Sequence, residues 1–160
     1  GYIMIELAFM QKLTLFLGHP MRALTVTLAT MLVASGIGAL WSVRIHKLQW
    51  IWPTIACCAA VFWMGLPTLM AQSVTWPVWS RCLAAAAMIS PVAFVMGIPF
   101  AWLLVRIPPN QVPWAWATNA LFTVIGAQLV VVSSMTVGFG FTLMCGVLAY
   151  APAFIQKVNR

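Results

Sequence analysis

The stretch Glu6–Gly38, ELAFMQKLTLFLGHPMRALTVTLATMLVASGIG, decides the fold of this chain. Two apolar runs meet in it at the corner Gly18-His19-Pro20, and it contains the only carboxylate side chain of the whole sequence, Glu6. Proline suits the first turn of a helix, where its missing N–H group would have no partner anyway. The pattern therefore predicts a helix over Tyr2–Leu17, a tight corner, and a second helix over Pro20–Val43.

The composition places the chain in the membrane. Hydrophobic residues make up 64% of the sequence and charged residues only 6%, with a mean hydropathy of +1.02. Water-soluble domains contain about 25% charged residues, and an apolar run of about 20 residues is long enough to cross the hydrocarbon layer as a helix. We therefore expect an all-α integral membrane bundle of about six transmembrane helices, forming a single domain over residues 1–160.

The remaining apolar runs predict four further helices, separated by segments rich in Trp, Pro and polar residues. They are expected over Ile51–Met70, Ser80–Val105 and Pro113–Ser133, and from the turn Gly138-Phe139-Gly140 to Phe154. Gly65-Leu66-Pro67 is expected to bend or end the third helix. Pro91 and Pro99 each remove a backbone hydrogen bond, which predicts a kink or a break in the fourth helix near Gly97-Ile98-Pro99.

Basic residues lie at the ends of the apolar runs, where they act as topology signals. One side of the membrane would carry Arg44, Lys47, Arg106, Lys157 and Arg160, and the other Arg22, Arg81 and, about a turn inside, Lys12. The positive-inside tendency then puts the C-terminus in the cytoplasm. The net charge of +7 is scattered along the chain, so we expect the lipid bilayer and other membrane subunits as partners, and no nucleic acid.

The chain starts at Gly1 and is apolar at once, with no charged region that would mark a signal peptide. A helix that begins before Gly1 is expected. The sequence is then a fragment, or the C-terminal half, of a longer membrane protein.

Glu6 is the first candidate for chemistry inside the membrane. A charged group at membrane depth costs at least about 2.5 kcal/mol, so such residues usually face the bundle and are paired or functional. Glu6 is either a carboxylate that handles protons or cations, or a structural acid that is protonated or hydrogen-bonded. Its neighbours at helical spacing, Met10 and Leu13, are apolar, so any partner must come from another helix.

His19 and Asn119 complete the polar candidates, with Gln11. His19 has the residue type of a metal or porphyrin ligand or a proton relay, but at a helix corner we expect it to hydrogen-bond open backbone groups. Asn119 belongs to a stripe of polar and small residues that also contains Gly126. If the stripe is functional, Glu6, Gln11, His19 and Asn119 would share one polar cavity between the first, second and fifth helices.

Small residues predict where helices pack closely. Ser35, Gly36 and Gly38 form one such patch in the second helix, and Gly126 lies in the fifth. Small side chains at four-residue spacing let a neighbouring helix approach. The sequence has no aspartate, no Gly-rich phosphate loop and no Ser-His-Asp set, so we expect no enzyme activity in this segment. No cofactor is indicated.

The run Ile5–Pro20 resembles the C-terminal membrane half of bacterial spermidine synthase-like multi-pass membrane proteins. Those proteins carry a Glu-Ile-Ala…Gln-Arg…Leu-Phe-Leu-Gly-His-Pro segment, followed by a helix that ends in Ser-Gly-x-Gly. Further likeness lies in Ser35-Gly36 with Gly38, Pro113–Trp116, Asn119-Ala120, Gly126 and Gly138-Phe139. The segment Gly97–Phe100 is similar to their Pro-Phe-Pro-Leu-Gly segment, although Ala101–Leu103 departs from it.

This resemblance implies a bacterial inner-membrane domain next to a soluble aminopropyltransferase-like domain, which has no counterpart in this sequence. No catalytic residue is carried over. We therefore expect a non-catalytic membrane domain that anchors or docks a partner, as an accessory subunit of a larger complex. Two alternatives are half of a secondary transporter, with a polar path at Glu6, Gln11 and Asn119, and the membrane part of a polyamine synthase-like protein.

Overall fold

The computed structural model describes residues 1–45, 48–73 and 75–151, and these form six α-helices and three short 3₁₀ turns. The α-helices are α1 (Tyr2–Leu17), α2 (Pro20–Trp41), α3 (Ile51–Gln72), α4 (Val78–Leu104), α5 (Val112–Thr136) and α6 (Phe139–Leu148). The 3₁₀ turns are η1 (Ser42–Arg44), η2 (Leu48–Trp50) and η3 (Pro109–Gln111). The prediction of an all-helical chain is confirmed, and no strand occurs in the part of the chain described.

Four helical segments are long and apolar enough to cross a membrane, as an integral membrane protein requires. They are Pro20–Arg44, Leu48–Gln72, Val78–Leu104 and Pro109–Thr136. The other two helices are shorter, with 16 residues in α1 and 10 in α6. At 1.5 Å per residue α1 is about 24 Å long, somewhat less than the hydrocarbon layer of about 30 Å.

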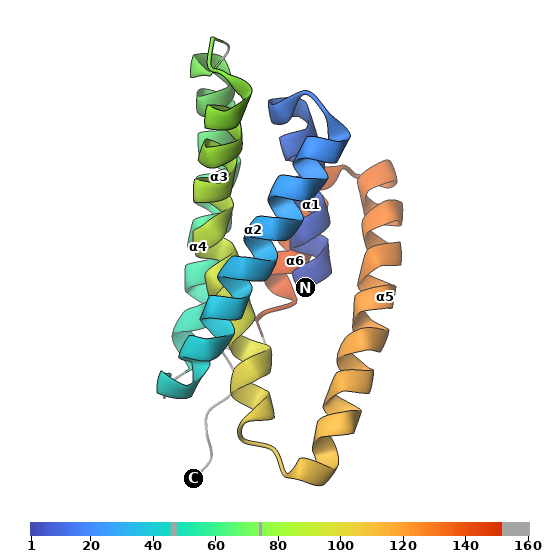
Figure 1. Cartoon of the computed structure of the whole chain (residues 1–160). Coiled ribbons are helices and arrows are strands. Elements are labelled where there is room, and N and C mark those ends of the chain that lie inside the picture. Colours follow the sequence, from blue (N-terminus) through green and yellow to red (C-terminus); the bar gives the residue numbers. More distant parts are fainter. Residues whose placement is uncertain (46–47, 74, 152–160) are drawn as a thin grey trace.

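The short helix α1 forms the centre of the bundle (Figure 1) and packs against α2, α4, α5 and α6. Its residues Ile5, Phe9 and Leu13 are completely buried. The Phe9 ring packs on Phe62 of α3, with the two ring centroids 4.0 Å apart. Because other helices surround it, the buried face of α1 is shielded from lipid as well as from water, whereas Gln11 and Leu15 remain exposed.

The corner between α1 and α2 follows from two local preferences. Gly18 ends α1 in the left-handed region, at φ 68°, which glycine adopts without the steric cost of a side chain. Pro20 opens α2, and the Nδ1 atom of His19 accepts a hydrogen bond from the Met21 backbone N–H at 3.3 Å. The expected backbone role of His19 as a cap is thus confirmed.

Helix α4 runs without interruption from Val78 to Leu104 with Pro91 and Pro99 inside it, so the predicted break near Gly97-Ile98-Pro99 is wrong. A proline leaves the carbonyl four residues earlier without its helical donor. For Pro91 that carbonyl belongs to Ala87, and the Ser90 hydroxyl donates a hydrogen bond to it at 3.2 Å. This hydrogen bond compensates locally for the donor that Pro91 removes.

The third and sixth helices also end elsewhere than expected. Helix α3 continues past Gly65-Leu66-Pro67 to Gln72, so this motif does not end it. Helix α6 begins at Phe139, after Gly138 at φ 108°, and ends at Leu148 instead of Phe154. Residues 152–160 lie outside the described chain, together with the basic residues Lys157 and Arg160 on which the orientation partly depends.

Helix α5 stands apart from the rest of the bundle over much of its length (Figure 1). Only Gly126 and Val130 of its 25 residues are buried. Both lie near the level of α1 and α6, the helices that α5 contacts. The lower part of α5 in the figure is therefore separated from α2 and α4 by a space that none of the described helices fills.

Candidate functional site

Glu6 is buried in α1, with 8% of its surface exposed. No hydrogen bond or ion pair joins its carboxylate to any residue that the structure describes. One turn earlier on the same face of α1, the Tyr2 hydroxyl donates to the Met31 carbonyl at 3.4 Å and to the Ser35 hydroxyl at 3.3 Å. Glu6 therefore lies in the interface between helices, and not in an open polar cavity.

The four polar candidates do not come together. Gln11 and His19 are exposed, and His19 lies at the end of α1 opposite to Tyr2. Asn119, in the first half of α5, faces a hollow that neither Glu6 nor Gln11 nor His19 lines. Helical spacing relates residues of one helix, but it does not fix the level at which two helices meet.

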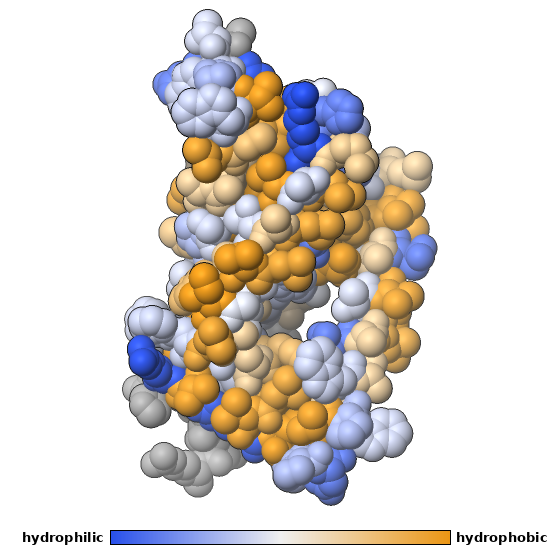
Figure 2. Space-filling model, in the orientation of Figure 1, coloured by the Kyte–Doolittle hydropathy of each residue, from blue (hydrophilic) through white to orange (hydrophobic). Residues whose placement is uncertain are grey.

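We call the space between α2, α4, α5 and the start of α1 the central hollow (Figure 2). Its volume is about 740 Å³. Its lining residues are Gly1, Tyr2, Leu32, Ser35, Gly36, Ala39, Met96, Gly97, Pro99, Phe100, Ala101, Leu104, Trp116, Asn119, Thr123, Ala149 and Tyr150. The sequence predicted a cavity near the first, second and fifth helices, but it did not predict the part that α4 takes in it.

As far as the described residues line it, the central hollow is mainly apolar and contains no charged side chain. Polar groups come from two sides: the hydroxyls of Tyr2 and Ser35 from α1 and α2, and Asn119 with Thr123 from α5. The Thr123 hydroxyl is used within α5, where it donates to the Asn119 carbonyl at 2.8 Å. The Asn119 side-chain amide makes no hydrogen bond to the described residues.

Gly38 and Gly97 mark the place where α2 and α4 cross, in the most extensive helix–helix contact of the bundle. A Cβ atom on Gly38 would collide with the Phe94 carbonyl oxygen, and one on Gly97 with the Ser35 carbonyl oxygen. In contrast, a Cβ atom on Gly36 would meet nothing within 4 Å. The Ala93/Gly97 spacing in α4 is the signal that sequence reasoning missed, because Gly97 was assigned to a helix break.

Gly126 is likewise a glycine at a close helix–helix contact, between α5 and α1. A Cβ atom there would come within 2.7 Å of the Ile3 side chain of α1. The small residue thus lets α5 approach α1 closely at this level. Gly126 is therefore a packing residue, as its place in the small-residue stripe suggested.

Arg106 and two aromatic residues hold the end of the bundle where α2 ends and α5 begins. The Trp102 Nε1–H donates to the Ile45 carbonyl at 3.0 Å, and the Arg106 guanidinium donates to the same oxygen at 3.2 Å. The guanidinium also lies 4.1 Å from the Trp102 ring centroid, and Arg44 lies 5.0 Å from Trp41. Such Arg–Trp contacts are typical of the membrane–water interface.

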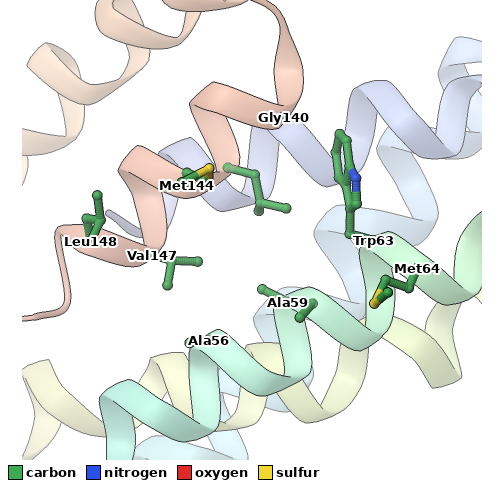
Figure 3. Close-up of a pocket in the computed structure, with 10 residues that line it drawn as sticks. Ala56, Ala59, Trp63, Met64, Gly140, Met144, Val147 and Leu148 are labelled. Carbon is green, nitrogen blue, oxygen red and sulfur yellow. The ribbon is translucent and has the colours of Figure 1, made fainter.

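A second hollow lies between α3 and α6 and is almost wholly apolar (Figure 3). Small residues of α3, Ala56 and Ala59 among them, face Gly140 and Val147 of α6, and Trp63 closes one end. Its volume of about 460 Å³ is large enough for part of an acyl chain. Without polar groups it offers no chemistry.

Comparison of the chain with known protein families, with curated proteins and with solved structures finds no match. Among the described residues, no group of three His, Cys, Asp or Glu side chains is placed to hold a metal ion. The likeness to spermidine synthase-like membrane proteins therefore stays a prediction. The features of the structure that bear on function are the exposed helix α5 and the central hollow.

Proposed function

We propose that this chain is a non-catalytic, multi-pass membrane domain that docks another membrane protein along α5, as an accessory subunit of a larger complex. The observation that carries this proposal is Gln128. It lies in the most exposed of the four long helices, its side chain is exposed, and it makes no hydrogen bond to the described residues. The amide thus has no partner among the described residues, at a level where lipid offers none.

The depth of Gln128 makes the missing partner costly. Counting 1.5 Å per residue, Gln128 lies about 24 Å from the start of α5 and about 12 Å from its end. An amide at that depth faces hydrocarbon, which cannot hydrogen-bond to it. Hydrogen bonds between membrane helices contribute about 0.6–2 kcal/mol each, so a partner helix with a polar residue at this level gains stability by packing here.

The surface around Gln128 suits a helix. Val124, Val131, Val132 and Met135 lie at helical spacing from it and are all exposed, at 52–84%. These side chains form an apolar face around one amide. We call this face, with Gln128, the outer face of α5.

Half of a secondary transporter has less support in the geometry. Of Glu6, Gln11 and Asn119, the three residues of the expected polar path, only Asn119 lines the central hollow. The predicted discontinuous helix is also missing, since α4 is continuous. The membrane part of a polyamine synthase-like protein is supported by the sequence resemblance alone.

The proposed subunit has six membrane segments, with α1 and α6 as the shorter ones, and a kink in α4 at one of its prolines. The end that carries Arg44 and Arg106 would face the cytoplasm of a bacterial inner membrane, by the positive-inside tendency. Both residues lie at one end of the bundle, because Arg106 binds the carbonyl of Ile45, the residue after Arg44.

Photo-crosslinking in native membranes tests the docking proposal. A photoreactive amino acid at Val132, on the outer face, is compared with one at Leu40, an exposed residue of α2. We expect a crosslink to one discrete membrane protein from position 132 but not from position 40, and its loss with Gln128→Leu. Native mass spectrometry should show the same protein in stoichiometric amount. Crosslinks to lipid alone at both positions would refute the proposal.

A further inference from the structure

We propose that the central hollow binds the head group of a neutral, quinone-type lipid. Such a head group is a flat ring with hydrogen-bond-accepting oxygens on two opposite edges. This binding site is separate from the outer face of α5, and it uses residues that the docking proposal leaves without a role. The size of the hollow suits such a ligand, since its volume of about 740 Å³ falls within the range of about 300–1,000 Å³ that is common for small-molecule sites.

Hydrogen-bond donors lie on two walls of the hollow. On the wall formed by α1 and α2, the Tyr2 hydroxyl makes only long hydrogen bonds, of 3.3 and 3.4 Å, whereas hydroxyl donors prefer about 2.7–2.8 Å. It can turn to a better acceptor at little cost. On the α5 wall, Asn119 presents an amide with no partner among the described residues. A ring with acceptors on opposite edges satisfies both donors.

Charge favours a neutral ligand. Among the described lining residues there is no Lys, Arg, His, Asp or Glu side chain, so an ionised head group would lose its hydration without gaining a side-chain counter-ion. Phosphate, carboxylate and ammonium head groups are therefore disfavoured. A neutral ring carrying carbonyl oxygens pays no such penalty, and its apolar substituents match the rest of the lining.

Aromatic side chains support a flat ligand. Phe100 of α4 and Trp116 of α5 both line the hollow and pack against each other edge to face, with their ring centroids 5.0 Å apart. Phe100 and Asn119 also line a neighbouring, shallower hollow of about 540 Å³ between α4 and the start of α5. That second space gives the apolar tail of the ligand a path from the ring site toward the lipid.

The test measures binding of decylubiquinone to the full chain in detergent micelles, through quenching of tryptophan fluorescence. Trp116 lines the hollow, so Trp116→Phe should remove much of the saturable quenching. We expect Asn119→Leu to weaken binding about fivefold to tenfold, because a buried acceptor loses its donor. The matched control Gln128→Leu makes the same replacement on the outer face of α5 and should leave the affinity unchanged.

A second variant keeps the test decisive if Asn119→Leu lowers expression. Gly36 lines the hollow and has free space at its Cβ position, so Gly36→Leu fills the hollow without a collision at Cβ and should abolish saturable binding. Competition separates the possible sources of the signal. Dioleoylglycerol and decane should displace the probe poorly. Equal competition by decane, or unchanged affinity in both Asn119→Leu and Gly36→Leu, would overturn the assignment.

Discussion

The crossing of α2 and α4 offers a prediction in which two glycines two residues apart behave oppositely. Gly38→Ala places a methyl group against the Phe94 carbonyl oxygen, which is main chain and cannot turn away as a flexible side chain could. The two helices must therefore separate along the most extensive contact of the bundle. Gly36→Ala, on the opposite face of the same helix, adds its methyl group to open space.

The expected magnitudes follow from two opposing terms. Replacing a helical glycine by alanine stabilises the helix by about 0.5–1 kcal/mol. Overpacking a close contact costs about 1–3 kcal/mol. Gly36→Ala should thus raise the free energy of unfolding by about 0.5–1 kcal/mol, and Gly38→Ala should lower it by about 1–2 kcal/mol. A separation of about 2 kcal/mol corresponds to roughly 30-fold in the unfolding equilibrium constant.

Unfolding in mixed micelles of mild detergent and increasing dodecyl sulfate, followed by circular dichroism, measures these differences. Gly97→Ala provides an independent check from the other helix, because its methyl group would collide with the Ser35 carbonyl oxygen. Gly38→Ala and Gly97→Ala separate the same two helices, so the loss in the double variant should be smaller than the sum of the two single losses. Equal effects of Gly36→Ala and Gly38→Ala would refute the close crossing.

Three further predictions use the same unfolding assay. Glu6→Gln should not lower the free energy of unfolding, because the carboxylate has no hydrogen bond or ion pair with the described residues; a loss above about 1 kcal/mol would reveal a stabilising partner. Phe62→Ala should lower the free energy of unfolding by about 2–3 kcal/mol, because the contact with Phe9 is lost. The loss is smaller than in a water-soluble core because lipid is itself apolar. An unchanged unfolding midpoint would argue against that contact. Gly18→Ala should lower the free energy of unfolding by about 1–2 kcal/mol, since the φ of 68° at this position disfavours a side chain. A gain in stability would contradict the left-handed conformation at this corner.

Much of the local structure could be predicted from the sequence. Helix α1 has the predicted bounds, and α2 begins at Pro20 as expected. The turn at Gly138 was also expected. These features depend on short-range properties: the length of an apolar run, the fixed φ of proline, and the tolerance of glycine for positive φ. Such preferences act within a few residues, so a single sequence contains them.

The candidate site was predicted only in part. Asn119 lines the central hollow, but Tyr2, Gly97 and Trp116 were not expected there. Tyr2 is the first residue of α1 and lies far from α5 in the sequence. Nothing in the sequence therefore indicates that Tyr2 lines the same hollow as residues of α5. Gly97 could have been found, because Ala93 precedes it by four residues, the spacing at which small side chains let a neighbouring helix approach.

The sequence by itself determined that this is an all-helical membrane chain and where its corners lie, because hydrophobicity and backbone preference are local properties. Only the tertiary structure decided that the short α1 lies at the centre, that α2 and α4 cross at Gly38 and Gly97, and that α5 stands away to leave a hollow. Every face of these helices is apolar, so periodicity does not reveal which face is buried. Which faces meet depends on how closely small residues let two backbones approach, and that requires both helices at once.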